Sequence, residues 1–474
     1  MDTPDVVVVG AGPTGLMMAC ELALGGARAV LLEERTDMPN ITRAFAVHAR
    51  TLELLDARGL ADELIPRGLV VREIAPPGGT TLDLGELPSR FAMVLMVPQS
   101  GTERLLQTRA EELGVRIVHG AKVVGLTQNG DGVTVDLAGG APVGARYVVG
   151  CDGAHSAIRG LLGIDFVGKQ YQTHILLADV RLASPPDDGL FAKAGPAGVV
   201  LFVPFGDGLF RAIVWDRLRE QAPLSEPVTL DEIRDAFGRI AGEDFGMREM
   251  RWSSRFLSER RQARHYRHGR GFLAGDAAHV HSPLGGQGMN TGLGDAMNLG
   301  WKLAATTRGH APRWLLDTYE RERHPVGAGV LRMTDAFNQI VLDHSVVRRA
   351  LRSFALGTIL RVPRTRRMVA ERLSGIAISY SRERGDDWMV GRRMPDIDCD
   401  GKRLYERLRE GRFVLVTAVP VELDRPDIVH TVDKHPELPD AVLVRPDGYV
   451  AWASERMPGA AELSAAIDRW SPVA

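Results

Sequence analysis

Cysteine is scarce in this sequence: Cys20, Cys151 and Cys399 are the only three in 474 residues. They lie far apart and form no C-x-x-C pair, which argues against a disulfide framework and against a thiol redox site. No cluster of metal-ligating residues stands out either, and we predict no metal site. Such cysteine usage fits a reducing compartment, so a cytoplasmic location is expected.

Long apolar runs are also missing. No stretch reaches the about 18 apolar residues that a membrane-spanning helix needs. The first residues include Asp2 and Asp5 where a signal peptide would carry basic residues, so neither a leader nor a membrane span is expected. The formal net charge is only −2, so nothing global calls for a nucleic acid or an anionic membrane as partner.

The chain is too long for one hydrophobic core, so two or three domains are expected. Its most informative segment is the start, "DVVVVGAGPTGLMMACELALGGARAVLLEER". Residues 6–9 are a run of valines, typical of a strand buried on both faces. Gly10, Gly12 and Gly15 follow, spaced as G-x-G-x-x-G: the first permits a tight turn, the second lets a pyrophosphate approach the backbone, and the third lets a helix pack against the strand.

An acidic residue completes this pattern. A second strand is predicted over residues 29–32, and Glu33 follows it, 18 residues after Gly15. A carboxylate at that strand end suits the hydroxyl pair of a ribose and would repel a 2′-phosphate. We therefore predict a dinucleotide site, and Leu16 and Met17 exclude a P-loop because they stand where Lys and Ser/Thr are required.

The rest of the chain alternates between helical and strand patterns. Helices are predicted over 48–65, with Gly59 as a break, and over 103–113, and short strands are predicted within 115–153. Residues 170–265 are strand-like and separated by Pro/Gly/Asp stretches, which indicates an inserted antiparallel sheet. Helical patterns dominate 285–385, and a last α/β segment occupies about 390–474.

A second glycine-rich segment decides between cofactors. In "GRGFLAGDAAHVHSPLGGQGMNTGLGDAMNLGWKLA" a strand ends at Asp276, and a Pro/Gly-rich loop leads into a helix near Met289. Asp276 is placed to bind the hydroxyls of a sugar-alcohol chain. The loop glycines allow a flat ring to lie against backbone N–H groups, which can stabilise negative charge on that ring. A flavin dinucleotide needs both segments, whereas NAD lacks the ribityl chain, so the sequence predicts FAD.

These motifs resemble the FAD-dependent aromatic hydroxylases, the group of para-hydroxybenzoate hydroxylase and phenol hydroxylase. The likeness rests on "GAGPTG", "DGAHSAIR", the segment around Asp276 and "LLDTYERERHPV", and is nearest to the actinomycete branch of aromatic-polyketide hydroxylases and rifampicin monooxygenase. It implies an α/β fold in which a Rossmann-like FAD-binding domain (1–169 and 266–385, with a helical region) carries an inserted antiparallel-sheet substrate domain (170–265). Residues 386–474 are implied to be a thioredoxin-like domain without redox cysteines.

The resemblance also implies roles for particular residues. The pyrophosphate contacts are Gly10, Gly12, Pro13, Thr14 and Gly15; Glu33 binds the adenosine ribose, Val123 the adenine, Arg43 the flavin side and Gln99 the ribityl region. Asp152 and Arg159 serve FAD and the nicotinamide donor, although Asp152 also fits a simple helix cap. Asp276 holds the ribityl hydroxyls, and the isoalloxazine is lined by Pro283, Gly286, Gly288, Met289 and Asn290.

The implied reaction is a monooxygenation. NADPH or NADH docks transiently and reduces FAD, O₂ adds to give a flavin C4a-hydroperoxide, and one oxygen atom passes to a polycyclic aromatic substrate of polyketide type. Three alternatives stay open: Baeyer–Villiger oxygenation, inactivation of an antibiotic such as rifampicin or tetracycline, and a flavin-binding protein without oxygenase activity. The oligomeric state, including a homodimer, is also left open.

No side-chain nucleophile is required by this chemistry, so no catalytic residue is assigned with certainty. His48, His279 and His281 are not needed for it. Arg211, in the strand "GLFRAIVW", is a candidate substrate anchor if Leu209, Ile213 and Trp215 share its inward face; the alternative places Arg211 in water. The basic run at 361–367 is interpreted as a solvated face.

Overall fold

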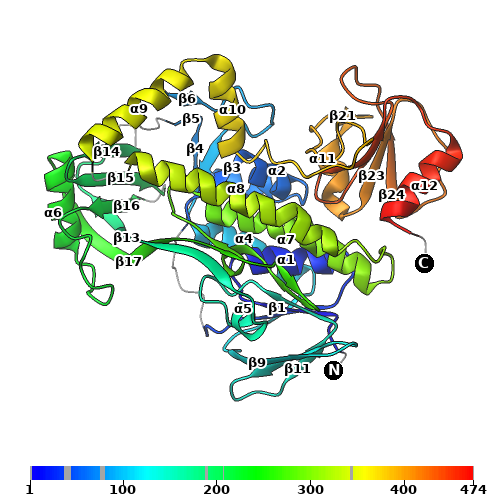
Figure 1. The fold of residues 1–474 in the computed structure, drawn as a ribbon, viewed down its shortest axis with the longest axis horizontal. Coiled ribbons are helices and arrows are strands. Elements are labelled where there is room, and N and C mark those ends of the chain that lie inside the picture. Colours follow the sequence, from blue (N-terminus) through cyan, green and yellow to red (C-terminus); the bar gives the residue numbers. More distant parts are fainter. Residues whose placement is uncertain are drawn as a thin grey trace.

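A computed structural model describes residues 3–36, 44–74, 81–186, 190–205, 208–341 and 345–472 of the chain. It has a mixed α/β fold, in which the C-terminal segment forms a separate lobe beside the main body (Figure 1). No helix within those ranges combines the length and the apolar composition that crossing a bilayer requires.

A six-stranded sheet lies at the centre of the main body. Its order is β18-β19-β12-β1-β2-β8, and every neighbouring pair from β19 to β8 is parallel. The predicted strands are confirmed at β1 (Val6–Val9) and β2 (Ala29–Leu32). The other members are β8 (Arg116–Val118), β12 (Tyr147–Gly150), β18 (Arg267–His268) and β19 (Gly271–Leu273).

This sheet is covered on both faces. Helices α1 (Pro13–Leu24), α4 (Gln99–Glu112) and α7 (Gln287–Thr307) pack together over one face. The small antiparallel sheet of β9 (Val123–Gln128), β10 (Val133–Leu137) and β11 (Val143–Ala145) lies beyond the other face, as Figure 1 shows. Helix α5 (Ala157–Leu161) follows β12. On one side of β1 lie β2 and β8, and on its other side lie β12 and β19. The strand order therefore reverses between β1 and β12.

Residues between β2 and β8 leave this sheet and return to it. The helix predicted over 48–65 is two helices, α2 (Ala49–Asp56) and α3 (Ala61–Leu64), because the chain turns at Gly59 with φ +74°. A 3₁₀ turn, η1 (Ile65–Arg67), follows α3. The helix predicted over 103–113 begins four residues earlier, at Gln99. Short strands complete this part: β3 (Ala46–His48), β4 (Leu69–Val71), β5 (Glu73–Ile74), β6 (Leu82–Asp83) and β7 (Val94–Met96).

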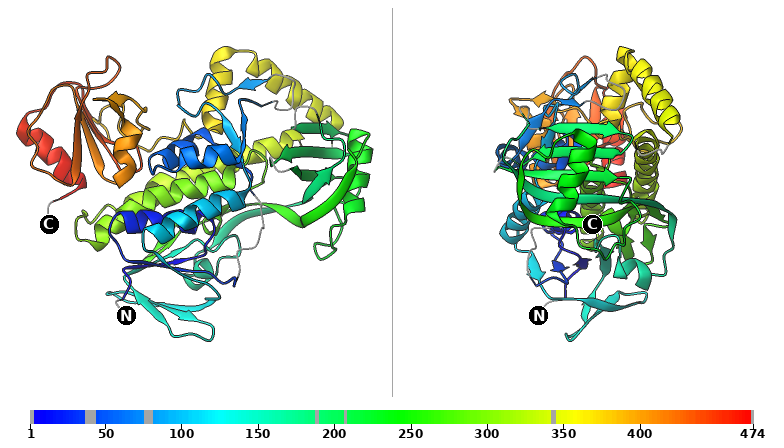
Figure 2. Two further views of the ribbon diagram at one scale, coloured as in Figure 1. Left: turned by 180° about the vertical axis from the view of Figure 1, so that it is seen from behind. Right: turned by 90° about the vertical axis from the view of Figure 1, so that its left-hand side faces the viewer.

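A second six-stranded sheet is wholly antiparallel, with order β14-β15-β16-β13-β17-β20. Helix α6 (Leu230–Ala241), which the sequence interpretation missed, packs its apolar residues on one face. The strands are β13 (Phe166–Leu182), β14 (Phe191–Gly195), β15 (Gly198–Pro204), β16 (Leu209–Asp216), β17 (Met247–Ala263) and β20 (His279–Val280). The 17-residue strands β13 and β17 run from this sheet back to the parallel one (Figure 2).

Three further helices follow α7: α8 (Asp317–Val341), α9 (Val346–Leu360) and α10 (Pro363–Leu373). The C-terminal lobe is a four-stranded sheet of order β24-β23-β25-β26 with α12 (Ala460–Trp470). Its strands are β23 (Phe413–Thr417), β24 (Ile428–Val432), β25 (Ala441–Val444) and β26 (Val450–Ser454), preceded by β21 (Asp398–Cys399), β22 (Lys402–Arg403), α11 (Leu404–Arg407) and η3 (Leu408–Glu410). One apolar cluster joins this lobe to Trp301 of α7 and to Leu315.

Candidate active site

The turn between β1 and α1 has the geometry that the glycine spacing predicts. Gly10 adopts φ +100°, and a Cβ there would lie 2.5 Å from the carbonyl oxygen of Cys151. A Cβ on Gly15 would collide with the carbonyl of Gly10, so this glycine permits the close helix–strand contact. A Cβ on Gly12 would meet no atom of the described residues within 4 Å. None of their side chains caps α1 at Gly12, so backbone N–H groups at the helix start are available to an anion.

Glu33 closes this turn from the end of β2. Its Oε2 accepts a hydrogen bond from Ala11 N at 2.7 Å, and its Oε1 accepts from Arg35 N at 2.9 Å and Arg35 Nε at 2.6 Å. Burial alone raises the pKa of Glu33, but the hydrogen bonds from Arg35 and Ala11 bring it below its ordinary value. Glu33 is therefore an anion that fixes β2 against the glycine turn. Arg35 was missed by the sequence interpretation.

Asp276 lies where a second strand of the sheet ends. It follows β19 on a 3₁₀ turn, η2 (Gly275–Ala277), and is exposed between two buried neighbours. It accepts no hydrogen bond from the described residues. Its turn is pressed against α1, because a Cβ on Gly275 would lie 2.6 Å from Thr14 Oγ1. The glycine turn and Asp276 thus come together although more than 240 residues separate them.

The loop before α7 forms the next wall. Gly286 is the N-cap of α7 with φ +61°, and a Cβ there would lie 2.8 Å from Ala46 Cβ. Asn290 joins this helix start to β3: its Nδ2 donates to Ala46 O at 2.9 Å, and its Oδ1 accepts from His48 N at 2.9 Å. Met289 is buried. The other two residues predicted to line the ring are Pro283 and Gly288, and both are half-buried.

A buried ionic group supports the Asp276 turn from behind. Asp295 of α7 is fully buried and accepts from Gly275 N at 3.0 Å, from Arg323 Nε at 2.7 Å and from the His279 ring at 2.7 Å. Burial alone raises the pKa of Asp295, and the charges of Arg323 and His279 reverse this and lower it. Sequence reasoning missed Asp295 and Arg323. Asp295 is a single acid in a glycine-rich apolar segment, and Arg323 lies within the charged run 320–324, which gives no sign of burial.

Two of the histidines lie beside this site. His48 Nε2 contacts Gly285 O at 2.9 Å, and burial lowers the pKa of His48 to about 4. His281 Nδ1 contacts Ser282 O at 2.8 Å, and burial likewise lowers its pKa. Both rings are therefore neutral at physiological pH.

Asp152 and Arg159 make structural contacts. Asp152 accepts from Ser156 Oγ at 2.5 Å and from Ile158 N at 3.1 Å, so it binds the first turn of α5, whose N-cap is Ser156. Arg159 donates to Ala277 O at 3.0 Å and to Ala154 O at 2.8 Å and stacks over Phe166. The two residues brace α5 against the Asp276 turn.

The other predicted cofactor residues are placed as follows. Gln99, the first residue of α4, accepts from Ala44 N at 3.0 Å and donates to Glu103 Oε1 at 2.8 Å. Val123 is buried at the start of β9. Arg43 lies outside the described residues.

Arg211 is fully buried on the face of its sheet that points away from α6. Phe210, Ala212 and Val214 pack against α6, so the alternation places Arg211 on the opposite face and not in water. Its guanidinium donates to Asp179, Nε to Oδ1 at 2.6 Å and Nη2 to Oδ2 at 3.0 Å. Trp252 lies 4.9 Å from it in a cation–π contact. Nη1 has no hydrogen-bond partner among the described residues.

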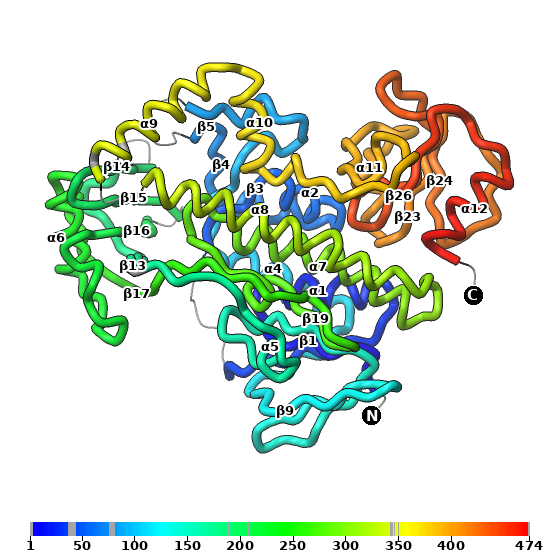
Figure 3. The backbone as a smooth tube through the Cα atoms, in the orientation of Figure 1, coloured from blue at the N-terminus to red at the C-terminus, as the bar shows by residue number. Residues whose placement is uncertain are grey.

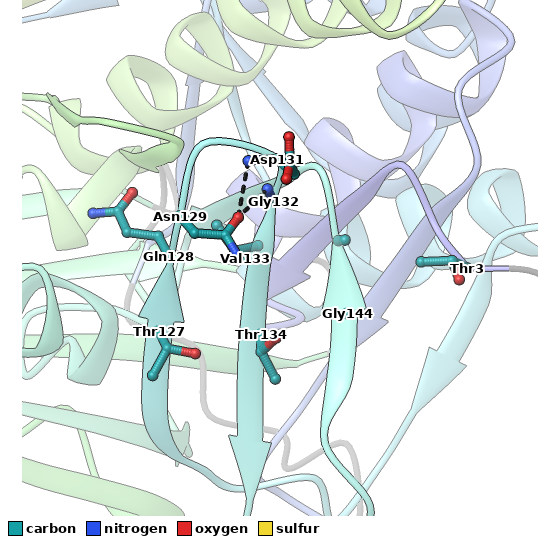
Figure 4. Close-up of a pocket in the computed structure, with 10 residues that line it drawn as sticks. Thr3, Thr127, Gln128, Asn129, Asp131, Gly132, Val133, Thr134 and Gly144 are labelled. Carbon is teal, nitrogen blue, oxygen red and sulfur yellow. Dashed lines mark hydrogen bonds between the residues drawn. The ribbon is translucent and has the colours of Figure 1, made fainter.

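A surface hollow on the β9–β11 sheet carries no comparable chemistry (Figure 4). It is lined by polar residues including Thr127, Gln128 and Thr134. Its Asn129 side chain accepts from Asp131 N at 2.8 Å and Gly132 N at 2.9 Å, which closes the turn between β9 and β10. We assign this hollow a structural role.

Comparison with known proteins gives consistent matches along the chain. Residues 3–334 match the family described as FAD binding domain, and residues 387–472 match the family described as aromatic-ring hydroxylase, C-terminal. Rifampicin monooxygenase from Streptomyces venezuelae is 41% identical over 460 residues, 95% of this chain and 96% of the relative. The solved structure of OxyS anhydrotetracycline hydroxylase from Streptomyces rimosus superimposes with a TM-score of 0.88 at 39% identity and covers 100% of both chains.

Not every similar protein is named for oxygenation. The structure of the Diels-Alderase PyrE3 from the biosynthetic pathway of pyrroindomycins superimposes with a TM-score of 0.87 at 34% identity, again over 100% of both chains. The fold and the domain content therefore extend to a protein whose name describes a carbon–carbon bond-forming reaction.

Proposed function

Since this chain belongs to the FAD-dependent aromatic-ring hydroxylases and is a flavin monooxygenase, we propose that it uses NADPH or NADH and O₂ to hydroxylate a polycyclic aromatic substrate of polyketide type. The observation that carries the substrate class is the sheet face around Arg211. It carries the buried ion pair of Arg211 and Asp179 beside apolar and aromatic side chains, and a few polar groups in an apolar wall are the composition of a pocket for a large aromatic ligand.

The described residues fit FAD. Gly12 leaves open space at a helix N-terminus where a pyrophosphate is stabilised, and Glu33 at the end of β2 is an anion placed for the ribose. Asp276 presents an exposed carboxylate to which no described residue donates, as a ligand for ribityl hydroxyls would. The start of α7 offers backbone N–H groups to the ring. We assign the remaining contacts as the sequence predicts, including Pro13, Thr14, Gln99 and Val123.

We propose that the parallel sheet is a Rossmann-like domain, made of 1–169 and 266–385. Its strand order reverses between β1 and β12, and ligands of such sheets bind at the carboxyl ends of the strands beside that reversal. Residues 170–265, which form most of the antiparallel sheet, are assigned as the substrate domain. The C-terminal residues 386–474 form a thioredoxin-like domain, supported by the pairing of β23 with β24 in parallel and with β25 antiparallel.

Bound FAD supplies electron transfer from the nicotinamide donor and activation of O₂. The protein supplies orientation and electrostatics. The positive end of α7 favours negative charge on the ring, and the neutral side chain of His48 behind Gly285 adds no competing charge. The buried walls exclude water, which protects reactive species from side reactions.

Arg211 is proposed to anchor the substrate. In register across four strands lie Val203, Arg211, Asp179 and Trp252. Asp179 occupies two donors of the guanidinium and holds it in place. Nη1, which has no partner among the residues that the structure describes, is left to donate to a phenolate or carbonyl oxygen. A buried N–H group without a hydrogen-bond partner destabilises the fold, and a ligand oxygen that accepts from Nη1 would remove this penalty. This supports the proposed role of Arg211.

Two other functions are each favoured by similar proteins. The likeness to rifampicin monooxygenase supports antibiotic inactivation, with the same chemistry on a different substrate. The likeness to the Diels-Alderase PyrE3 supports a flavin-dependent fold without oxygenation.

A screen of polycyclic phenols, quinones and ansamycin or tetracycline antibiotics for stimulated NAD(P)H oxidation tests the proposal. The expected result is a phenolic polyketide that stimulates oxidation and yields a product with one additional oxygen atom by mass spectrometry. Turnover of an antibiotic alone would favour inactivation, and a transformed substrate without added oxygen would contradict monooxygenation.

A further inference from the structure

Helices α9 and α10 carry an unusual number of large apolar side chains in solvent. Val347 is 76% exposed, Leu351 66% and Phe354 70%. Three more follow along the hairpin: Ile359, Val362 and Met368, each at least 43% exposed. We refer to these six residues as the hairpin surface. A patch of this kind on a folded protein marks an interaction site more often than chance exposure.

The apolar residues of α9 form one row. Val347, Leu351 and Phe354 are spaced i, i+4 and i+7, which places them on the same side of the helix. Leu360, on the opposite side of the helix, is buried. Figures 1 to 3 show α9 and α10 along the outer edge of the molecule. The exposed fractions of the three side chains show that the row itself is open to solvent.

The same hairpin is strongly basic. Between residues 345 and 373 the sequence has eight arginines and a single acidic residue, Glu371. Arg348 and Arg352 directly follow Val347 and Leu351, so positive charge flanks the apolar row. The net charge of −2 for the whole chain conceals this local concentration.

The positive charge of the hairpin distinguishes between two partners that could cover the apolar row, a second copy of the chain and an anionic surface. A second copy of the chain docking through the same helices would bring eight more arginines against these eight, and the repulsion opposes such a contact. An anionic surface reverses the sign of that interaction. Basic residues beside exposed aliphatic and aromatic side chains are the composition of helices that lie in the interface of an anionic bilayer.

We propose that the hairpin surface docks the protein on membranes rich in acidic phospholipid. The apolar row enters the headgroup boundary, and the arginines contact the lipid phosphates. This contact is peripheral and independent of the oxygenation chemistry.

Sedimentation of the holoenzyme with vesicles tests the proposal. We expect co-sedimentation with vesicles that contain phosphatidylglycerol, little with phosphatidylcholine alone, and release at high salt because exposed charges are screened. The double substitution Leu351→Glu/Phe354→Glu should reduce the bound fraction at least tenfold. The matched control Leu218→Glu changes a leucine that is 73% exposed elsewhere, and should bind like the parent.

A second pair of variants separates the electrostatic contribution. Arg364→Gln/Arg367→Gln should weaken binding to phosphatidylglycerol vesicles and leave the apolar row unchanged. Absence of vesicle binding by the parent protein would overturn the proposal, as would binding that the Leu351→Glu/Phe354→Glu protein retains. A dimer in the parent that this double variant dissociates would also overturn it and assign the hairpin surface to a second copy.

Discussion

Arg445, directly after β25, donates to both carboxylate oxygens of Glu322 on α8, at 2.7 Å and 3.0 Å. Both residues are buried. The neighbour of Glu322 on α8 is Arg323, which holds Asp295 and through it the turn that presents Asp276. The C-terminal lobe is thereby connected, by ion pairs and one helix, to the candidate cofactor site.

The substitution Arg445→Met should therefore weaken both the fold and FAD binding. It leaves Glu322 and Asp447 buried without their main partner, and removing one member of a buried ion pair costs roughly 3–5 kcal/mol. Urea unfolding and FAD titration followed by fluorescence measure the two effects. Arg469→Met, which removes an exposed pair with Glu383, is the control. Unchanged stability of Arg445→Met would contradict this prediction.

The chromophore itself is the simplest test of the site. Because the β1–α1 turn and Asp276 together fit both halves of a flavin dinucleotide, the purified protein should be yellow and release FAD upon acid precipitation. Chromatography identifies the released flavin. Recovery of FMN, or of no flavin after reconstitution, would contradict the assignment.

Glu33→Gln should weaken FAD binding by about tenfold or more, since a hydrogen bond to a charged group contributes roughly 1.5–3 kcal/mol. The adjacent Glu34→Gln is a matched control, because Glu34 is exposed and pairs with Lys122. FAD dissociation constants from fluorescence titration of the apoprotein give the comparison. Equal constants for both variants would show that Glu33 does not bind the ribose.

Arg211→Met should raise KM about tenfold or increase release of peroxide, with normal FAD content, because the substrate loses a charged donor. Steady-state kinetics and peroxide assays on the identified substrate measure this. The substitution also leaves Asp179 buried and unpaired, so Arg211→Met/Asp179→Asn is a second variant that removes the stranded charge. Coupled turnover at the parent KM in the double variant would show that Arg211 is structural.

The buried His48 predicts a pH dependence of stability. Its folded pKa is about 4, whereas an unfolded histidine titrates near 6.5. Between these values only the unfolded state binds the proton, so the free energy of unfolding falls as the pH falls, by up to about 1.4 kcal/mol per pH unit. Above pH 6.5 the ring is neutral in both states and this contribution is fully retained.

Urea unfolding at several pH values, with saturating FAD, measures the slope. His48→Gln should have a shallower decline between pH 6.5 and 4 than the parent, and the exposed His119→Gln should decline like the parent. Identical slopes in all three proteins would mean that His48 does not titrate as its burial implies.

Local signals in the sequence predicted local structure well. The bounds of β1 and β2 agree with the structure because a valine run, a glycine turn and a terminal acid are all encoded within 35 residues. Helix α6 was missed although its signal was present: Thr229 caps it, Glu232 accompanies the cap, and Gly242 ends it with φ +92°. The segments on both sides of it have strand-like composition, so the whole of 170–265 was interpreted as strands.

Pairings across the chain were beyond such reasoning. Asp276 was found because a strand and a glycine loop flank it. Asp295 and Arg445 were not, because the partners that bury them, Arg323 and Glu322, become neighbours only when α7, α8 and the C-terminal lobe pack together. Likewise, the sequence left open which face of the antiparallel sheet Arg211 occupies. The packing of α6 against the other face settles this.

The cofactor site brings residue 10 to residue 276, and this has a consequence for synthesis on the ribosome. Strand β12 has β1 on one side and, on the other, β19, which emerges more than 120 residues later. Until then the nascent sheet has an open edge that invites pairing with other chains. FAD cannot bind across the site before residue 290 has left the exit tunnel. FAD therefore binds late in synthesis. Because FAD binds only the folded state, its presence at that point stabilises the newly completed sheet.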